Sequence, residues 1–188
     1  MSETELYSVI YQDIQDALSE LLLKTRDQHL FAIGLGMVED LCGFFHVGCT
    51  LEDITDFEDV SELWWISEWQ HASTANNRVH HAITALYHAL GDDCTDAQYI
   101  ELRQHYQNTM IQVLQDLRKQ GKLKNQQGEE MMIIIQYADA FDEDFEDVSF
   151  PLMNLEFLAP LFQNRFKKQK GPNLSDYLLE RLEKYQAL

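Results

Sequence analysis

The chain has 188 residues, a length that suits one domain with a sizeable core. It carries 14 Lys and Arg against 32 Asp and Glu, and its formal net charge of -18 disfavours nucleic acids and anionic membrane surfaces as partners, because both are bound through basic side chains. Hydrophobic residues make up 45% of the chain and Gly and Pro are few, so we expect a folded chain rather than a disordered one.

Targeting signals and disulfide patterns are not apparent. Acids occupy the first residues, where a secretory signal carries basic side chains, and no apolar run approaches the length of a membrane span. We therefore expect a cytoplasmic protein. Cys42, Cys49 and Cys94 form neither a C-x-x-C pair nor an even-numbered framework, which favours reduced, partly buried thiols.

The first part of the chain predicts a helix followed by two strands. Residues 2–24 combine a capping box with apolar side chains at helical spacing. Residues 29–38 form a near-continuous apolar run, in which Gly34 and Gly36 lie on one face and leave room for a helix to lie close against the strand. A second β-rich run covers residues 42–49, so the two runs predict an antiparallel hairpin.

Two helices are expected in the middle of the chain. Residues 50–63 are mainly acidic and lack periodicity, which predicts an exposed loop. Ser67 and Gln70 have capping-box spacing, and a helical stripe continues to residue 90. The same signals recur over residues 95–120, so an antiparallel helix pair is expected.

The last part predicts one more strand and two more helices. Residues 131–137 include three consecutive isoleucines, which favours a buried strand beside the hairpin. The acidic segment 139–147 follows, and residues 155–168 and 173–186 have helical patterns. Together these elements predict a single α+β domain over residues 1–188, with a small antiparallel sheet (the hairpin plus a late strand) packed by about five helices.

No residue pattern indicates a cofactor, a metal ion or covalent catalysis. The seven histidines include no H-E-x-x-H motif, and the four aspartates between residues 139 and 147 lack the glycine of an EF-hand loop. Residues 27–77 contain no Lys or Arg that would lower the pKa of the Cys42 or Cys49 thiol. We therefore expect no cofactor, no metal ligand and no catalytic residue.

A short motif in the middle of the chain resembles a known family. Trp64-Trp65-Ile66-Ser67-Glu68-Trp69 is similar to the tryptophan, serine, glutamate and tryptophan signature of the bacterial domain-of-unknown-function family 4303. The order of elements fits as well, with Phe31-Ala-Ile-Gly-Leu before the motif, then a late strand ending in Asp139 and a segment like Leu152-Met-Asn-Leu. The resemblance covers roughly residues 5–168, and it implies a bacterial α+β protein of a kind often associated with toxin and immunity loci.

The resulting hypothesis is an immunity protein that binds and neutralises a cognate bacterial toxin domain, for example a nuclease, in the cytosol. Acidic side chains would speed its encounter with a basic toxin, and aromatic side chains would stabilise the bound state. The residues expected to bind the partner are Asp56, Phe57, Glu58, Asp59, Glu62, Trp64, Asp142, Glu143, Asp144, Glu146 and Asp147. A merely solvated acidic face is the competing interpretation, and for the tryptophans it is a structural role in closing the core.

Two other function classes remain open at this stage. One is an enzyme with a carboxylate-based site, for example Glu68, whose burial would raise its pKa enough for general acid catalysis. The other is a homo-oligomeric interaction module, although a monomer or weak homodimer is the expected state. The acids concentrate in residues 39–68 and 129–147, which would allow both segments to share one edge of the sheet.

Overall fold

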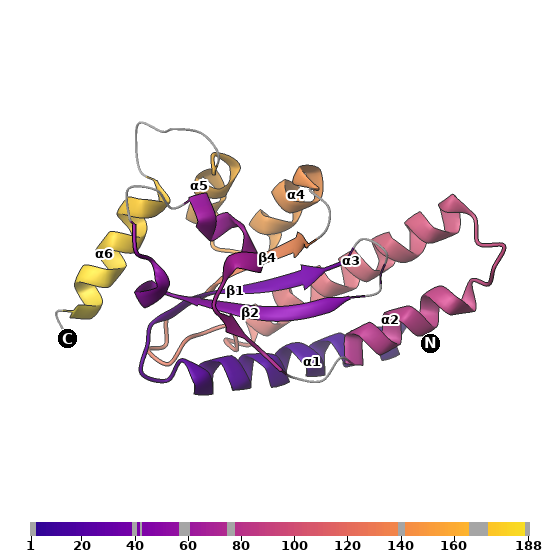
Figure 1. Cartoon of the computed structure of the whole chain (residues 1–188), viewed down its shortest axis with the longest axis horizontal. Helices are drawn as coiled ribbons and strands as arrows, with labels where there is room; N and C mark the ends of the chain where they lie inside the picture. The colour runs from indigo at the N-terminus through magenta and orange to yellow at the C-terminus, as the bar shows by residue number, and fades with distance from the viewer. Residues whose placement is uncertain are drawn as a thin grey trace.

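A four-stranded sheet separates two layers of helices (Figure 1). The computed structural model describes residues 3–38, 41, 43–56, 61–74, 78–138, 142–165 and 173–186. The strands are β1 (Leu30–Met37), β2 (Phe44–Thr50), β3 (His71–Ala72) and β4 (Met132–Tyr137), in the order β3-β2-β1-β4. The fold class is therefore α+β, as the sequence predicts, and β4 forms one edge of the sheet.

The sheet is mixed, whereas an antiparallel sheet was expected. The β1–β2 hairpin is antiparallel as predicted, but β4 runs parallel to β1. Both faces of the sheet are covered by helices, which suits a parallel pair and explains the continuous apolar sequence of β4. Because Thr50 pairs with the start of β1 and Tyr137 with its end, the acidic segments that follow β2 and β4 leave from opposite ends of the sheet.

Three long helices cover one face of the sheet. They are α1 (Glu3–Lys24), α2 (Arg78–Ala89) and α3 (Asp96–Lys119). Figure 1 shows α1 and α2 along the lower side of the sheet. Ile33 and Leu35 of β1 and Ile133 and Ile135 of β4 point into this layer. The capping box predicted at Thr95 is present, while Ser2, which would cap α1, lies outside the described residues.

Shorter elements cover the opposite face. They are the 3₁₀ turns η1 (Leu51–Asp53), η2 (Ser61–Trp64), η3 (Ile66–Glu68) and η4 (Glu156–Leu158), and the helices α4 (Glu143–Met153), α5 (Ala159–Gln163) and α6 (Leu174–Gln186). Figure 1 shows α4 and α5 above the sheet and α6 beside its left-hand end. Among the described residues no helix combines the length and the apolar composition needed to cross a bilayer.

Three helix predictions differ from the structure. The helix expected over residues 155–168 is instead the turn η4 followed by the short helix α5, which ends at Gln163. The helix expected to begin at Ser67 begins at Arg78, because the backbone first forms η3 and then the short strand β3. The Ser73 N–H donates to the His46 carbonyl at 2.9 Å, so this segment extends along β2 instead of coiling. In addition, α4 occupies a segment for which only an acidic stretch was expected; its first turn is capped by Asp142, which accepts from the Phe145 N–H at 3.0 Å.

Gly34 allows the 3₁₀ turns to approach the sheet. A Cβ atom at this position would lie 2.8 Å from Ile66 Cβ and 2.9 Å from Val47 Cγ2. The expected use of the small residues on this face, close approach of a neighbour, is therefore confirmed, although the neighbour is η3 and not a helix of the expected kind.

We expect Gly34→Ala to lower the free energy of unfolding by about 1–3 kcal/mol, because η3 or Val47 must move to admit the methyl group. Urea unfolding followed by tryptophan fluorescence measures this change. A variant as stable as the wild type would contradict the close contact between β1 and η3.

A buried acid and a buried histidine face each other between α1 and β2. Asp13 Oδ2 lies 3.5 Å from His46 Nε2, and both side chains are almost fully buried. Burial raises the pKa of Asp13 to about 6, although Arg78 partly offsets it, and burial lowers the pKa of His46 to about 4. Burial therefore makes the charged form of each group less favourable in the folded protein than in water.

We expect Asp13→Asn to gain stability over the wild type as the pH rises. The folded pKa of Asp13, about 6, lies above its ordinary value of 3.8, so its contribution to stability is complete below pH 3.8 and is lost as the pH rises through 6. The difference in unfolding free energy between variant and wild type should change by about 2 kcal/mol between pH 4 and pH 7. Thermal unfolding across this range measures it, with the exposed Asp27→Asn as the control.

Candidate functional site

The α4 helix begins with its first residues fixed to the end of β4. Arg103 of α3 donates from Nη2 to Asp142 Oδ2 at 2.8 Å and from Nε to the Tyr137 hydroxyl at 3.0 Å. Gln107 donates to the same hydroxyl at 2.9 Å. Asp142 also caps the helix, so its carboxylate joins α4 to Arg103, and Arg103 in turn joins α3 to Tyr137 of β4.

A buried amide near the end of β4 connects the strand to three neighbouring segments. Gln136 donates from Nε2 to the Trp64 carbonyl at 3.0 Å and to Glu146 Oε1 at 3.1 Å, and its Oε1 accepts from the Ile66 N–H at 3.2 Å. Three of its hydrogen bonds thus hold η2, η3 and α4 against one strand. Since a buried amide without partners is costly, this arrangement favours one position for each segment.

Glu146 forms a buried ion pair with Arg165, which lies two residues after the end of α5. Arg165 Nη2 lies 3.2 Å from Glu146 Oε2, and the two side chains are 2% and 1% exposed. Arg165 also binds Asp147 and donates to the Phe162 carbonyl at 3.1 Å. Burial raises the pKa of Glu146, and hydrogen bonds from Gln136 and the charge of Arg165 act in the opposite direction.

The end of α4 covers the open edge of β4. Asn154 accepts from the Ile133 N–H and donates to the Ile133 carbonyl, both at 2.7 Å, so its amide pairs with the strand as a further strand would. Arg118 of α3 donates to the Met153 and Met131 carbonyls. An exposed edge strand invites association with other chains, and here side chains occupy it.

The outward side of α4 differs from this network, since it combines acids with exposed apolar side chains. Asp144, Val148 and Leu152 follow each other at four-residue spacing and therefore lie on one side of the helix. Val148 is 64% exposed and Leu152 is 50% exposed, and Leu155 and Phe157 continue the exposed apolar surface into η4. We define the α4 face as Asp144, Asp147, Val148, Leu152, Leu155, Glu156 and Phe157.

The structure gives the predicted partner-binding residues different environments. Asp144 and Asp56 are exposed, Asp147 is half-exposed beside Arg165, and Asp142 is the partly buried helix cap. Trp64 is 3% exposed and packs edge-on against the Phe162 ring, and Glu146 is buried as well, so a partner could reach neither side chain without local rearrangement. Phe57, Glu58 and Asp59 lie outside the described residues, as do the side chains of Glu62 and Glu143.

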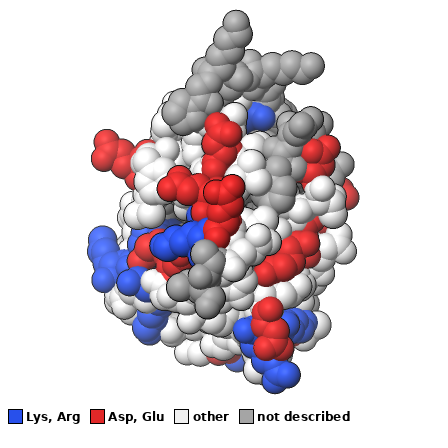
Figure 2. All heavy atoms as spheres, turned by 90° about the vertical axis from the view of Figure 1, so that its left-hand side faces the viewer, with Lys and Arg blue, Asp and Glu red and all other residues white. Residues whose placement is uncertain are grey.

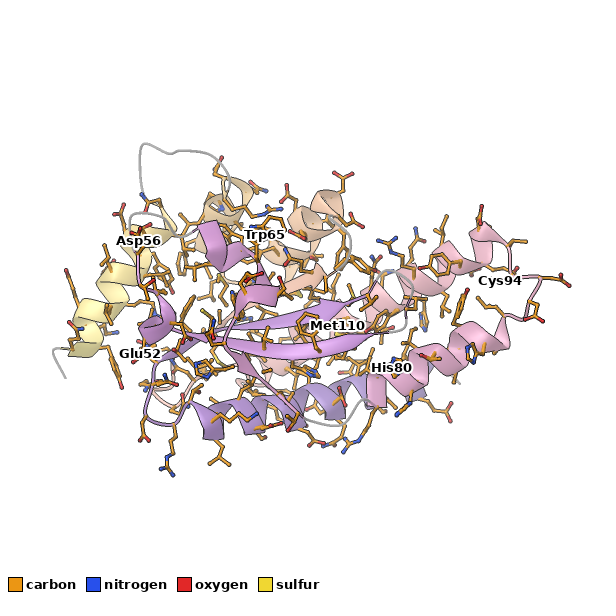
Figure 3. All side chains as sticks on the ribbon, viewed as in Figure 1. Glu52, Asp56, Trp65, His80, Cys94 and Met110 are labelled. Carbon is orange, nitrogen blue, oxygen red and sulfur yellow. The ribbon has the colours of Figure 1, made fainter. Side chains whose placement is uncertain are left out.

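The two acidic segments approach each other through η2, not along a sheet edge. Figure 3 places Glu52 and Asp56 at the end of the molecule where α6 lies, and Cys94 at the opposite end. Trp65, which follows η2, is 39% exposed, and Figure 3 shows it on the side that carries α4 and α5. Residues 61–68 therefore lie beside α4, whereas residues 51–56 lie near α6.

The end of the molecule with α6 has a second charged cluster with a structural role. Glu129 accepts from Arg181 at 2.6 Å and lies 2.8 Å from His29 Nε2, which fixes α6 to the start of β1. Burial is the main cause that lowers the pKa of His29. Figure 2 shows red carboxylate side chains over much of this end, with most blue side chains in contact with red ones.

Glu68, the carboxylate expected for an enzymatic site, lacks the buried environment that the enzyme hypothesis requires. Glu68 is exposed at the end of η3, so it is not the buried general acid. In the described part of the chain, the buried carboxylates are Asp13 and Glu146 instead. Within the described ranges, no group of three or more His, Cys, Asp or Glu side chains is placed to hold a metal ion.

Sequence reasoning missed the residues that position α4. Gln136 interrupts the apolar run of β4, and this single polar side chain in a buried strand was the available signal. Arg103, Arg118 and Arg165 are far from α4 in the sequence, so their contacts with the acidic segment have no local signature. Val148 and Leu152 of the α4 face were missed because no helix was expected over α4.

Comparison with known proteins gives a family but no named relative. A family model described as a domain of unknown function (DUF4303) matches residues 10–150. No curated protein and no solved structure matches the chain. The matched region includes all four strands, the tryptophan motif and the contact between Gln136 and Glu146, and it ends within α4.

We expect Arg165→Met to lower the free energy of unfolding by about 3 kcal/mol at pH 7, because Glu146 then keeps a buried charge without its partner. The loss should shrink as the pH falls and Glu146 becomes protonated. Urea unfolding at several pH values measures both effects.

Two further variants make this test specific. The double variant Glu146→Gln/Arg165→Met should recover much of the lost stability, since it removes both charges. Arg26→Met breaks an exposed ion pair with Asp27 and should cost less than about 1 kcal/mol. Equal losses for Arg165→Met and Arg26→Met would contradict the proposed role of the buried pair.

Proposed function

This chain belongs to the DUF4303 family of domains of unknown function, and we propose that it is an immunity protein which binds and neutralises a basic bacterial toxin domain in the cytoplasm. The observation that carries the proposal is the exposed acidic surface on α4. Residues 142–158 contain six acids and no Lys or Arg, and Asp144 and Glu156 are exposed there.

Electrostatics supports a basic partner. The net charge of -18 gives the whole molecule an attractive field for a cationic protein, which raises the association rate at low ionic strength. Toxin domains that act on nucleic acids carry basic clefts for phosphate groups, and carboxylates on a rigid helix would occupy such a cleft in place of phosphates. With its cleft occupied in this way, the toxin domain could no longer bind its nucleic acid substrate.

Rigidity supports the same proposal. α4 is fixed at its start by Arg103, in its middle by Gln136 and Arg165, and at its end by Asn154. A helix held in this way presents its outward side in one geometry, so little ordering entropy is lost when a partner binds. A tight inhibitor gains affinity when its binding helix is already held in the geometry of the complex.

The test is co-expression with the toxin gene encoded beside this protein. We expect the wild-type chain to restore growth to cells that produce the toxin, and purified proteins to associate more slowly as salt increases. Asp144→Lys/Glu156→Lys should lower the association rate by about tenfold at low salt.

Asp92→Lys/Asp93→Lys is the matched control, because it makes the same change in net charge in the exposed turn between α2 and α3. This control should associate within about twofold of the wild-type rate, since its charges lie away from α4. Absence of a neighbouring toxin gene, or toxicity that the wild-type chain does not relieve, would overturn the proposal.

A further inference from the structure

We infer that the α4 face is a docking surface for a basic amphipathic helix of the partner protein, with Val148 and Leu152 at its centre. This inference rests on the proposed function and specifies which surface is used and which chemistry it recognises. It concerns the outward side of α4, whereas the buried network of Gln136, Glu146 and Arg165 positions the helix.

The exposed apolar side chains of this molecule are concentrated on this face. Of the eight large hydrophobic side chains that are exposed in the described part of the chain, four lie between residues 148 and 157. They are Val148, Leu152, Leu155 and Phe157. Apolar side chains gathered in this way commonly mark protein interfaces, whereas isolated ones are ordinary.

The geometry fits a helix as the occupant. Asp144, Val148 and Leu152 span nine residues of α4, or about 12 Å along its axis, which corresponds to roughly two turns of a partner helix. The Phe157 ring contacts the Tyr177 ring of α6 with centroids 5.3 Å apart, so the apolar surface extends towards α6. Two helices in contact over this length can interlock apolar side chains at three- and four-residue spacing.

The charges around the apolar residues define the partner. Asp144, Asp147 and Glu156 lie within one helical turn of them in the sequence, and Arg165, which binds Asp147, is buried. A partner helix would therefore carry apolar residues on one side and Lys or Arg along its margins. A second copy of this chain would bring Asp144, Asp147 and Glu156 against the same three acids, and an anionic lipid surface would repel them too.

A designed peptide tests this chemistry without knowledge of the natural partner. The probe is a synthetic amphipathic helix with leucines on one side and lysines along both margins, labelled for fluorescence anisotropy. We expect wild-type protein to bind it, and Val148→Ser/Leu152→Ser to bind at least tenfold more weakly. A peptide with glutamates in place of the lysines should not bind.

Matched variants distinguish peptide binding at the α4 face from nonspecific binding to exposed apolar side chains. Ile100→Ser removes an apolar side chain of α3 that is as exposed as Leu152, 50% in both cases, and it should leave binding unchanged. Equal weakening by Ile100→Ser, or no weakening by Val148→Ser/Leu152→Ser, would overturn the inference. So would self-association of the wild type that Leu152→Ser abolishes, because a second copy would then be the occupant.

The same variants distinguish this inference from the proposed function. If wild type relieves toxicity and the Val148→Ser/Leu152→Ser variant relieves it equally well while remaining folded, the immunity function stands and the docking surface is wrong. If wild type binds the peptide through the α4 face but relieves no toxicity, the immunity function is wrong and the docking surface stands. Circular dichroism and urea unfolding of each variant exclude loss of folding as the cause.

Discussion

The side-chain amide of Gln136 positions elements in the layer that covers the sheet opposite α1, α2 and α3. This group is buried in an edge strand, and it has a donor and an acceptor that must find partners there. It finds them in the backbone of Trp64 and Ile66 and in the carboxylate of Glu146, so one amide determines where the tryptophan motif and α4 lie. Arg165 then places α5 by pairing with Glu146.

The edge position of β4 explains why several polar side chains gather around it. A parallel strand at the edge of a sheet leaves N–H and carbonyl groups unpaired along one side. Asn154 and Arg118 satisfy several of these groups, and they do so from the end of α4 and from α3. The contacts that protect the edge are therefore the same contacts that fix α4 to the sheet.

The elements with strong local periodicity could be predicted from the sequence, and those that depend on distant side chains could not. α1, α3, the hairpin and β4 follow from apolar spacing and from the Thr95 capping box. The capping-box spacing of Ser67 and Gln70 predicted a helix that does not form there. The distant Gln136 accepts a hydrogen bond from the Ile66 N–H, at the start of the 3₁₀ turn η3. The parallel direction of β4 has no local signal either, since it depends on the path of α2 and α3.

The candidate site could likewise be predicted only in part, because a run of acids in the sequence does not reveal which of them face outwards. Asp142 and Glu146 are at successive turns of one helix start, yet each pairs with an arginine of another element, and their charge contributes to folding. Asp142 also lies where the helix dipole favours a negative charge. Within residues 142–158 fewer acids are therefore available to a partner than the composition suggests. Asp144, Asp147 and Glu156, which remain accessible, lie near Val148 and Leu152 in the sequence, so charge and apolar surface can act on the same partner.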